Sequence, residues 1–249
     1  MRRRAPRGDR SVARSLSTFK YLTFDVVGTL IDFEAGLTAP LAAIAAEHGV
    51  PFDPEAALAL YRDARYMPDA LRFPDDLTRV YGVIAPKLGL PSDAAYGARL
   101  RAAVPGWTAF PDSAEALERL AKRYKLIAMT NAQRWAYEHF SNALGNPFYA
   151  AFTTDDTGTE KPDPAFFEQV FSFVEADGGA KDDVLHVAQS QYHDIGVSRQ
   201  LGLTNCWIQR RHAQPGYGGT IAPSQFTTPD YHFTSMAELA DAVEARHAA

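Results

Sequence analysis

The chain has 249 residues, which is long for one compact domain and predicts a large domain or a domain with an insert. Hydrophobic residues make up 46% and charged residues 22%, which excludes wholesale disorder, and no apolar run approaches the roughly 18 residues that span a bilayer. A single cysteine, Cys206, excludes an internal disulfide framework and any multi-cysteine metal site.

The net charge of −5 is unevenly distributed along the chain. Residues 1–18 hold six arginines and one aspartate, a local charge of +5, so the remainder carries −10. We predict that residues 1–18 are a disordered tail, and three interpretations of it remain open: an ordinary extension, an Arg- and Ser-rich targeting segment, or an arm for anionic surfaces. The acidic remainder is a poor general binder of nucleic acid.

The first predicted element is a short buried strand, residues 21–25, which ends in Asp25 and is followed by a Gly28-Thr29 turn. Residues 35–107 then show helical patterning without a convincing strand, and the first helix there is expected from residue 37 to Gly49.

From Trp107 onwards, short apolar strands alternate with amphipathic helices, and the strands are expected at residues 125–131, 149–154, 183–190 and 203–211. This alternation predicts an α/β fold: a Rossmann-like parallel sheet core (19–34 and 108–249) with helices on both faces, plus an inserted all-helical cap domain (35–107).

Polar side chains follow several of these predicted strands. In open α/β sheets, ligands bind outside the carboxyl ends of the strands, so side chains at those ends are expected to meet. Each could also serve as an ordinary helix cap or solvent-exposed group, but their shared location favours an active site. The candidates are Asp25, Thr29, Thr130, Asn131, Lys161, Gln189, Ser190, Tyr192, His193 and Asp194.

Four motifs at these strand ends resemble the signatures of the haloacid dehalogenase superfamily. They occur in the family's order: residues 22–29 (LTFDVVGT), 126–131 (LIAMTN), 161–164 (KPDP) and 184–194 (VLHVAQSQYHD). The helical insert directly after the first motif is similar to the mobile cap of the family's first cap class. The resemblance covers residues 21–210 and implies the family's fold and hydrolytic chemistry.

The resemblance also implies roles for individual residues. Asp25 would be the nucleophile, which gains reactivity where it is held and partly desolvated. Lys161 would keep Asp25 ionised and offset the charge of an anionic substrate. Thr29 and Thr130 can donate hydrogen bonds to carboxylate oxygens, and Asp194 would orient or activate water.

Two departures distinguish the chain from the superfamily's phosphatases. Val27 stands where they carry the acid that protonates the leaving group, and Gln189 replaces a carboxylate of their Mg²⁺ site. We therefore expect no required cofactor and no metal; were Mg²⁺ bound, its ligands would be Asp25, the Val27 backbone and Asp194.

The subgroup that lacks both features is the type II (L-2-haloacid) dehalogenases, in which halide leaves without a proton. The sequence resembles this subgroup at Arg62, in an aromatic-Arg context, and at Asn131, and both are expected to receive the leaving group or bind substrate. Four further residues are expected to line the pocket: Val27, Ser190, Tyr192 and His193. His186, within an apolar strand, is expected to be structural.

The predicted function is hydrolysis of a small 2-substituted carboxylic acid through an aspartyl ester, with 2-haloacids as the lead substrates. Motif four also resembles azetidine-2-carboxylate hydrolase, which makes the opening of a strained ring a second candidate reaction. A phosphatase or phosphonatase of the same fold is a third candidate, and a non-catalytic binding protein is a fourth. We expect a cytoplasmic protein with no nucleic-acid or membrane partner; a homodimer is common in the subgroup, but the sequence leaves the oligomeric state open.

Overall fold

The structure is a computed structural model that describes residues 14–247, so most of the predicted tail lies outside the described residues. Residues Leu16–Thr18, which the sequence places in that tail, instead form a 3₁₀ turn in which Leu16 is buried. Leu16 packs into the main hydrophobic core, and the Tyr124 hydroxyl donates a hydrogen bond of 3.1 Å to its carbonyl oxygen. The folded core therefore includes residues that precede position 19.

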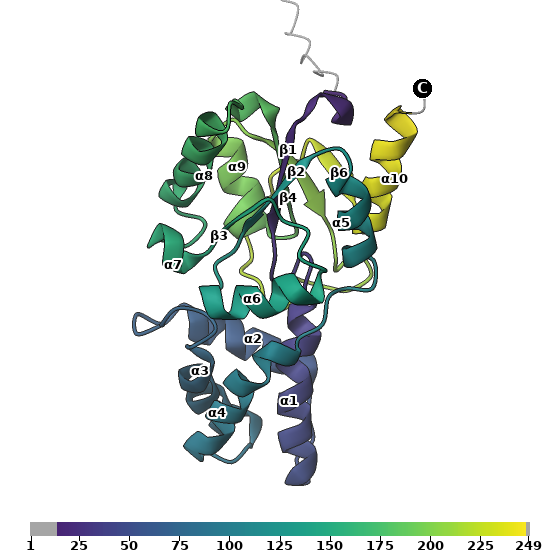
Figure 1. Ribbon diagram of the computed structural model, residues 1–249. Coiled ribbons are helices and arrows are strands. Elements are labelled where there is room, and N and C mark those ends of the chain that lie inside the picture. The colour runs from purple at the N-terminus through teal and green to yellow at the C-terminus, as the bar shows by residue number, and fades with distance from the viewer. Residues whose placement is uncertain (1–13, 248–249) are drawn as a thin grey trace, which may run out of the picture.

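One parallel sheet of six strands, in the order β3-β2-β1-β4-β5-β6, forms the centre of the described structure (Figure 1). The strand bounds are β1 Tyr21–Asp25, β2 Lys125–Met129, β3 Ala150–Phe152, β4 Val184–Ala188, β5 Thr204–Ile208 and β6 Tyr231–Phe233. The short edge strand β6 was not predicted. β1 lies between β2 and β4, and its five residues are all buried, as expected for a central parallel strand covered on both faces.

Helices cover both faces of the sheet, which confirms the predicted α/β class. Two separate hydrophobic clusters result: one joins β1, β2 and β4 to α5, α6 and α10, and the other joins the opposite sheet face to α8 and α9. The helix bounds are α5 Ser113–Ala121, α6 Arg134–Ala143, α7 Thr154–Thr157, α8 Pro164–Ala176, α9 Gly196–Gln200 and α10 Met236–His247. None of the described helices is long and apolar enough to cross a membrane.

Four helices between β1 and α5 form the cap, which lies beyond the carboxyl ends of the strands (Figure 1). They are α1 Phe33–Glu47, α2 Pro54–Arg65, α3 Leu77–Ile84 and α4 Ala94–Ala102. α1 begins four residues before its expected start because the Asp32 carboxylate caps it, accepting a hydrogen bond of 3.0 Å from the Ala35 N–H. The predicted cap boundary after residue 34 therefore falls inside the first turn of α1.

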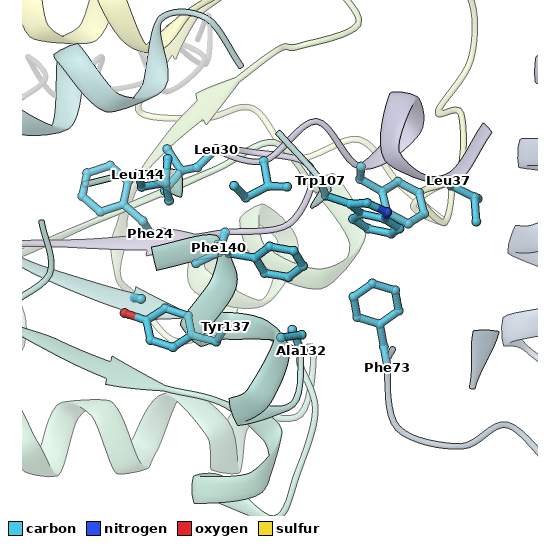
Figure 2. Packing of buried hydrophobic residues seen from close by; sticks show 14 of the residues in the cluster. Phe24, Leu30, Leu37, Phe73, Trp107, Ala132, Tyr137, Phe140 and Leu144 are labelled. Carbon is cyan, nitrogen blue, oxygen red and sulfur yellow. The ribbon is translucent and has the colours of Figure 1, made fainter. Parts of the chain in front are cut away.

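The two segments that connect the cap to the sheet run antiparallel beside each other. Asp32 N–H donates to the Thr108 carbonyl and Phe110 N–H donates to the Leu30 carbonyl, each at 2.9 Å. Next to these connecting segments, the ring of Trp107 stacks on the ring of Phe140 of α6, with ring centroids 6.1 Å apart (Figure 2). A β-carbon at Gly36 would lie 2.5 Å from the Trp107 ring, so only glycine fits there.

Candidate active site

A cavity of about 350 Å³ lies between the carboxyl ends of the strands and the cap. Its floor comes from the sheet motifs and its roof from α1, α2 and the segment after α2. The lining residues are Asp25, Val27, Phe33, Tyr61, Arg62, Arg65, Tyr66, Phe73, Thr130, Asn131, Ala132, Glu160, Lys161, Pro162, Gln189, Ser190, Tyr192, His193, Asp194, Gly219, Thr220 and Ile221. Eleven of the twelve candidate residues named from the sequence are in this set, and Thr29 is the exception.

Three charged groups form the buried floor of the cavity. Asp25 is the last residue of β1, Lys161 precedes α8, and Asp194 lies in a π-helical turn after β4. The Lys161 ammonium donates hydrogen bonds to Oδ1 of Asp25 at 2.9 Å and to Oδ1 of Asp194 at 2.6 Å. Three segments that are distant in the sequence thus meet at one ammonium group.

Thr29 lies behind Asp25 rather than in the cavity wall. Its hydroxyl donates a hydrogen bond of 2.5 Å to Oδ2 of Asp25 and accepts one of 2.9 Å from the Gln189 N–H. The chain reaches this position through Gly28, whose φ of 91° lies in the region that favours glycine. Both oxygens of Asp25 are therefore held by donors, one from Lys161 and one from Thr29.

Thr130 and Asn131 lie in the cavity wall, but their hydrogen bonds differ from those predicted. The Thr130 hydroxyl accepts a hydrogen bond of 3.1 Å from the Ala132 N–H, and no bond from it to a carboxylate is seen within residues 14–247. The Asn131 amide donates to the Lys161 carbonyl at 2.8 Å and accepts from the Lys161 N–H at 2.7 Å. Asn131 thus fixes the backbone of Lys161, and the leaving-group role predicted for it remains a prediction.

Burial and charge shift the pKa values of the two carboxyl groups in opposite directions. Burial raises the pKa of Asp25, and the nearby charge of Asp194 adds to the effect against the opposing influence of Lys161. Burial also disfavours ionised Asp194, but Lys161 and His186 outweigh it and lower the pKa of Asp194 to about 2. The carboxylates likewise outweigh burial at Lys161 and raise its pKa, so the ammonium stays charged.

These shifts predict a measurable pH dependence. An ionised Asp25 is needed for nucleophilic attack, so activity should fall as the pH is lowered through the pKa of Asp25. Because that pKa is raised, the acid limb of a kcat/KM profile should lie above the ordinary Asp value of 3.8. A limb at or below that value would contradict the direction of the shift.

The cap supplies two arginines to the cavity, of which only Arg62 was predicted. Arg62 donates a hydrogen bond of 2.7 Å to the Gly218 carbonyl of the core, and no ion pair of Arg62 is seen in the described chain. Arg65, one turn further along α2, instead pairs with the fully buried Asp76. Arg62 is therefore the cap cation with charge available to an anion in the cavity.

The residues after β4 fold back on themselves at the cavity wall. The Ser190 hydroxyl accepts a hydrogen bond of 2.9 Å from the His193 N–H and lies 3.1 Å from Nδ1 of the same ring. Burial lowers the pKa of His193 to about 4, so its imidazole is neutral near pH 7. The Tyr192 ring contacts Tyr66 of the cap edge-on, with centroids 6.4 Å apart, which brings cap and core together beside the cavity.

Several lining residues had no recognisable signal in the sequence. Phe33, Tyr61 and Phe73 form an aromatic wall, with the Phe33 and Tyr61 centroids 5.1 Å apart, but aromatic residues in helical segments look like ordinary core. Glu160 directly precedes Lys161 of motif three, but the motif itself assigns no role to that position. Burial raises the pKa of its carboxyl group.

The charged groups of the floor do not fit a bound Mg²⁺ ion, the metal that the family's phosphatases use. Asp25 and Asp194 already share the Lys161 ammonium, and the neutral Gln189 stands where the phosphatases carry a further carboxylate; Val27 offers only its backbone oxygen. No group of three His, Cys, Asp or Glu residues suited to a metal is found in the described part of the chain. Each of the two carboxylates already accepts a hydrogen bond from the Lys161 ammonium, so no catalytic step is assigned to a metal.

Comparison with known families agrees with the fold and the motifs. A family model described as haloacid dehalogenase-like hydrolase matches residues 19–195. The chain therefore belongs to the haloacid dehalogenase-like hydrolases. No curated protein is similar enough in sequence to count as a match.

Solved structures show the same fold at low sequence identity. An L-2-haloacid dehalogenase from Xanthobacter autotrophicus with covalently bound chloropropionic acid is 21% identical, covering 91% of this chain and 98% of its own, with a TM-score of 0.69. A defluorinating L-2-haloacid dehalogenase is 22% identical, covering 93% and 98%, with a TM-score of 0.71. A magnesium-bound hydrolase of the family from Bacillus subtilis is 18% identical, covering 91% and 99%, with a TM-score of 0.72. Fold similarity thus does not separate dehalogenases from magnesium-bound relatives.

Proposed function

We propose that the protein hydrolyses small 2-substituted carboxylic acids, with 2-haloacids as its lead substrates, through an ester on Asp25. The observation that carries the proposal is the environment of Asp25: a buried carboxylate at the cavity floor, held by Lys161 and Thr29. A carboxylate held in place and partly desolvated is a competent nucleophile.

In the first step, a carboxylate oxygen of Asp25 attacks the substituted carbon from the side opposite the leaving group. The carbon–halogen bond breaks, the halide leaves with the bonding electrons, and the configuration inverts. No proton is needed, which agrees with Val27 in the cavity wall where an acid would otherwise stand. Arg62 is the cation available to the substrate carboxylate or to the departing halide.

In the second step, water attacks the carboxyl carbon of the Asp25 ester. One proton of the water passes to Asp194. The acyl–oxygen bond then breaks, and the departing oxygen of the 2-hydroxy acid takes that proton from Asp194, which leaves Asp25 as a neutral carboxyl group. Asp25 then loses the second proton of the water to solvent, so each turnover releases one proton and one halide ion. The low pKa of Asp194, about 2, keeps this carboxylate ionised at neutral pH, so it can accept the hydrogen bond that orients the water.

The direct test is halide release from a panel of 2-haloacids in the presence of a chelator. We expect release from 2-chloropropionate with no loss of rate on chelation, because Asp25, Lys161 and Asp194 supply the chemistry. A parallel arm with p-nitrophenyl phosphate and Mg²⁺ tests for phosphatase activity. Chelator-sensitive phosphate release without halide release would overturn the proposal.

A second candidate substrate is a cyclic amino acid such as azetidine-2-carboxylate, which carries an ammonium group. The observation that favours it is Glu160, a carboxylate in the cavity wall whose nearest described cation, on Arg65, is 3.8 Å away. The ammonium group of such a substrate could form an ion pair with the Glu160 carboxylate. Adding azetidine-2-carboxylate to the same panel separates the two candidates, because ring opening releases no halide.

A further inference from the structure

His186 lies in the middle of β4, directly beneath the catalytic floor, and is fully buried. In the sheet it pairs with Thr23 of β1, two residues before Asp25. Side chains two residues apart on a strand share a face, so Thr23 and Asp25 lie on the same side of the sheet. The ring of His186 is thus placed below Asp25 and beside Asp194.

Both ring nitrogens of His186 have hydrogen-bond partners. Nε2 lies 3.1 Å from Oδ1 of Asp194, and Nδ1 lies 2.9 Å from the hydroxyl oxygen of Thr23. Ionised Asp194 can only accept, so Nε2 must carry the hydrogen. In the neutral ring Nδ1 is then the acceptor, and the Thr23 hydroxyl donates to it. Asp194 therefore sets the tautomer of His186, and the Thr23 hydroxyl supports that tautomer by donating to Nδ1.

The two oxygens of Asp194 have different surroundings as a result. Oδ1 accepts from both Lys161 and His186, whereas Oδ2 is buried and has no hydrogen-bond partner among the described residues. A buried carboxylate oxygen without a donor is costly unless a ligand or water supplies one. Asp194 is also among the residues that line the cavity with Asp25, which makes a water molecule of the active site the candidate donor to Oδ2.

We propose that His186 is a positioning residue for the second half of the reaction: by fixing Oδ1 of Asp194 it leaves Oδ2 as the oxygen that holds the hydrolytic water. This inference rests on the proposed ester mechanism. Oδ2 accepts one proton of the water as the water oxygen bonds to the carboxyl carbon of Asp25. The same proton then passes to the oxygen of the departing 2-hydroxy acid. His186 itself gains and loses no proton.

The proposal separates the two chemical steps, because formation of the ester does not need the water. In His186→Phe, the halide burst of the first turnover should keep its wild-type rate, and ester hydrolysis should slow on the order of 100-fold, as a misplaced water predicts. The ester on Asp25 should then accumulate and be detectable by mass spectrometry of the intact protein. Equal slowing of both steps, or wild-type hydrolysis, would overturn the inference.

Two further variants separate positioning from packing. His186→Gln keeps an N–H that can donate to Asp194 and an oxygen that can accept from Thr23, so it should restore most of the hydrolysis rate. Phe167→Leu disturbs the ring that packs edge-on against His186, with centroids 5.4 Å apart, without touching the polar chain. It should not accumulate the ester, and accumulation there would make the effect one of packing and contradict the proposal.

The tautomer of His186 can be measured without any substrate. In ¹⁵N nuclear magnetic resonance of the wild-type protein we expect the hydrogen on Nε2, and Thr23→Val should disturb that state. A hydrogen on Nδ1 alone would overturn the inference whatever the substrate. Failure of every acid in the panel to form an ester would instead overturn the proposed function, and the tautomer would still decide whether His186 holds Asp194.

Discussion

Asp25→Asn should lower turnover by at least about 10⁴-fold, because a neutral amide oxygen is a poor nucleophile. The change preserves the shape of the side chain, and its carbonyl oxygen can still accept the hydrogen bond from Thr29. The variant should therefore fold like the wild type and still bind substrate. The measurement is halide release under saturating 2-chloropropionate, with circular dichroism to check folding.

Asp177→Asn is the matched control. The Asp177 carboxylate accepts a hydrogen bond from the Tyr21 hydroxyl at the opposite end of β1, away from the cavity. It should keep wild-type turnover. Single turnover in ¹⁸O-water completes the test: the label should enter Asp25, while the first product carries an oxygen that came from Asp25. Retained activity in Asp25→Asn, or label in the first product, would remove Asp25 as the nucleophile.

Lys161→Met should have the second largest effect, about a 10³-fold loss of activity together with a loss of stability. It removes the ammonium that Asp25 and Asp194 share while keeping a side chain of similar length. Breaking a buried pair in this way costs roughly 3–5 kcal/mol of unfolding free energy, because buried charge loses its partner. Halide release and urea unfolding measure the two effects.

The pH dependence of this stability loss has a definite sign. Without Lys161 the pKa values of both carboxyl groups rise, so the folded state binds protons more tightly than the unfolded state. The two carboxyl groups then lower the free energy of unfolding once the pH rises above their pKa values in the unfolded state. The deficit of Lys161→Met should therefore be smaller in acid than at neutral pH. Lys20→Met, which removes an exposed ion pair with Asp183, should change stability by less than about 1 kcal/mol at either pH, and an equal effect in both variants would contradict the assignment.

The order of strands and helices could be predicted from the sequence because each long element has its own hydrophobic period. The failures came where local signals were short. β6 has only three residues, too few for an alternating pattern to stand out, and it is fixed by pairing with β5. Leu16 looked like part of a polar tail, because its burial depends on distant core residues such as Tyr124.

The floor of the site was predictable because its residues belong to contiguous motifs, whereas the roof was not. Arg65 could not be distinguished from Arg62 by pattern, since both lie on α2. What separates them is Asp76, eleven residues later, which pairs with Arg65. His186 looked like core, and it is fully buried, but its polar partners come from β1 and from the turn after β4. Contacts of this kind are set by tertiary packing and leave no local trace.

The position of β1 at the centre of the sheet has a consequence for how the molecule assembles. Its two neighbours begin about 100 and 160 residues further along the chain, at Lys125 and Val184. The strand that carries Asp25 therefore cannot pair on both sides until most of the chain has been synthesised. Such non-local pairing slows folding and leaves an apolar strand exposed in partly folded states. During synthesis we expect the cap helices to form early, while β1 depends on β4 to complete both its pairing and the charged floor around Lys161.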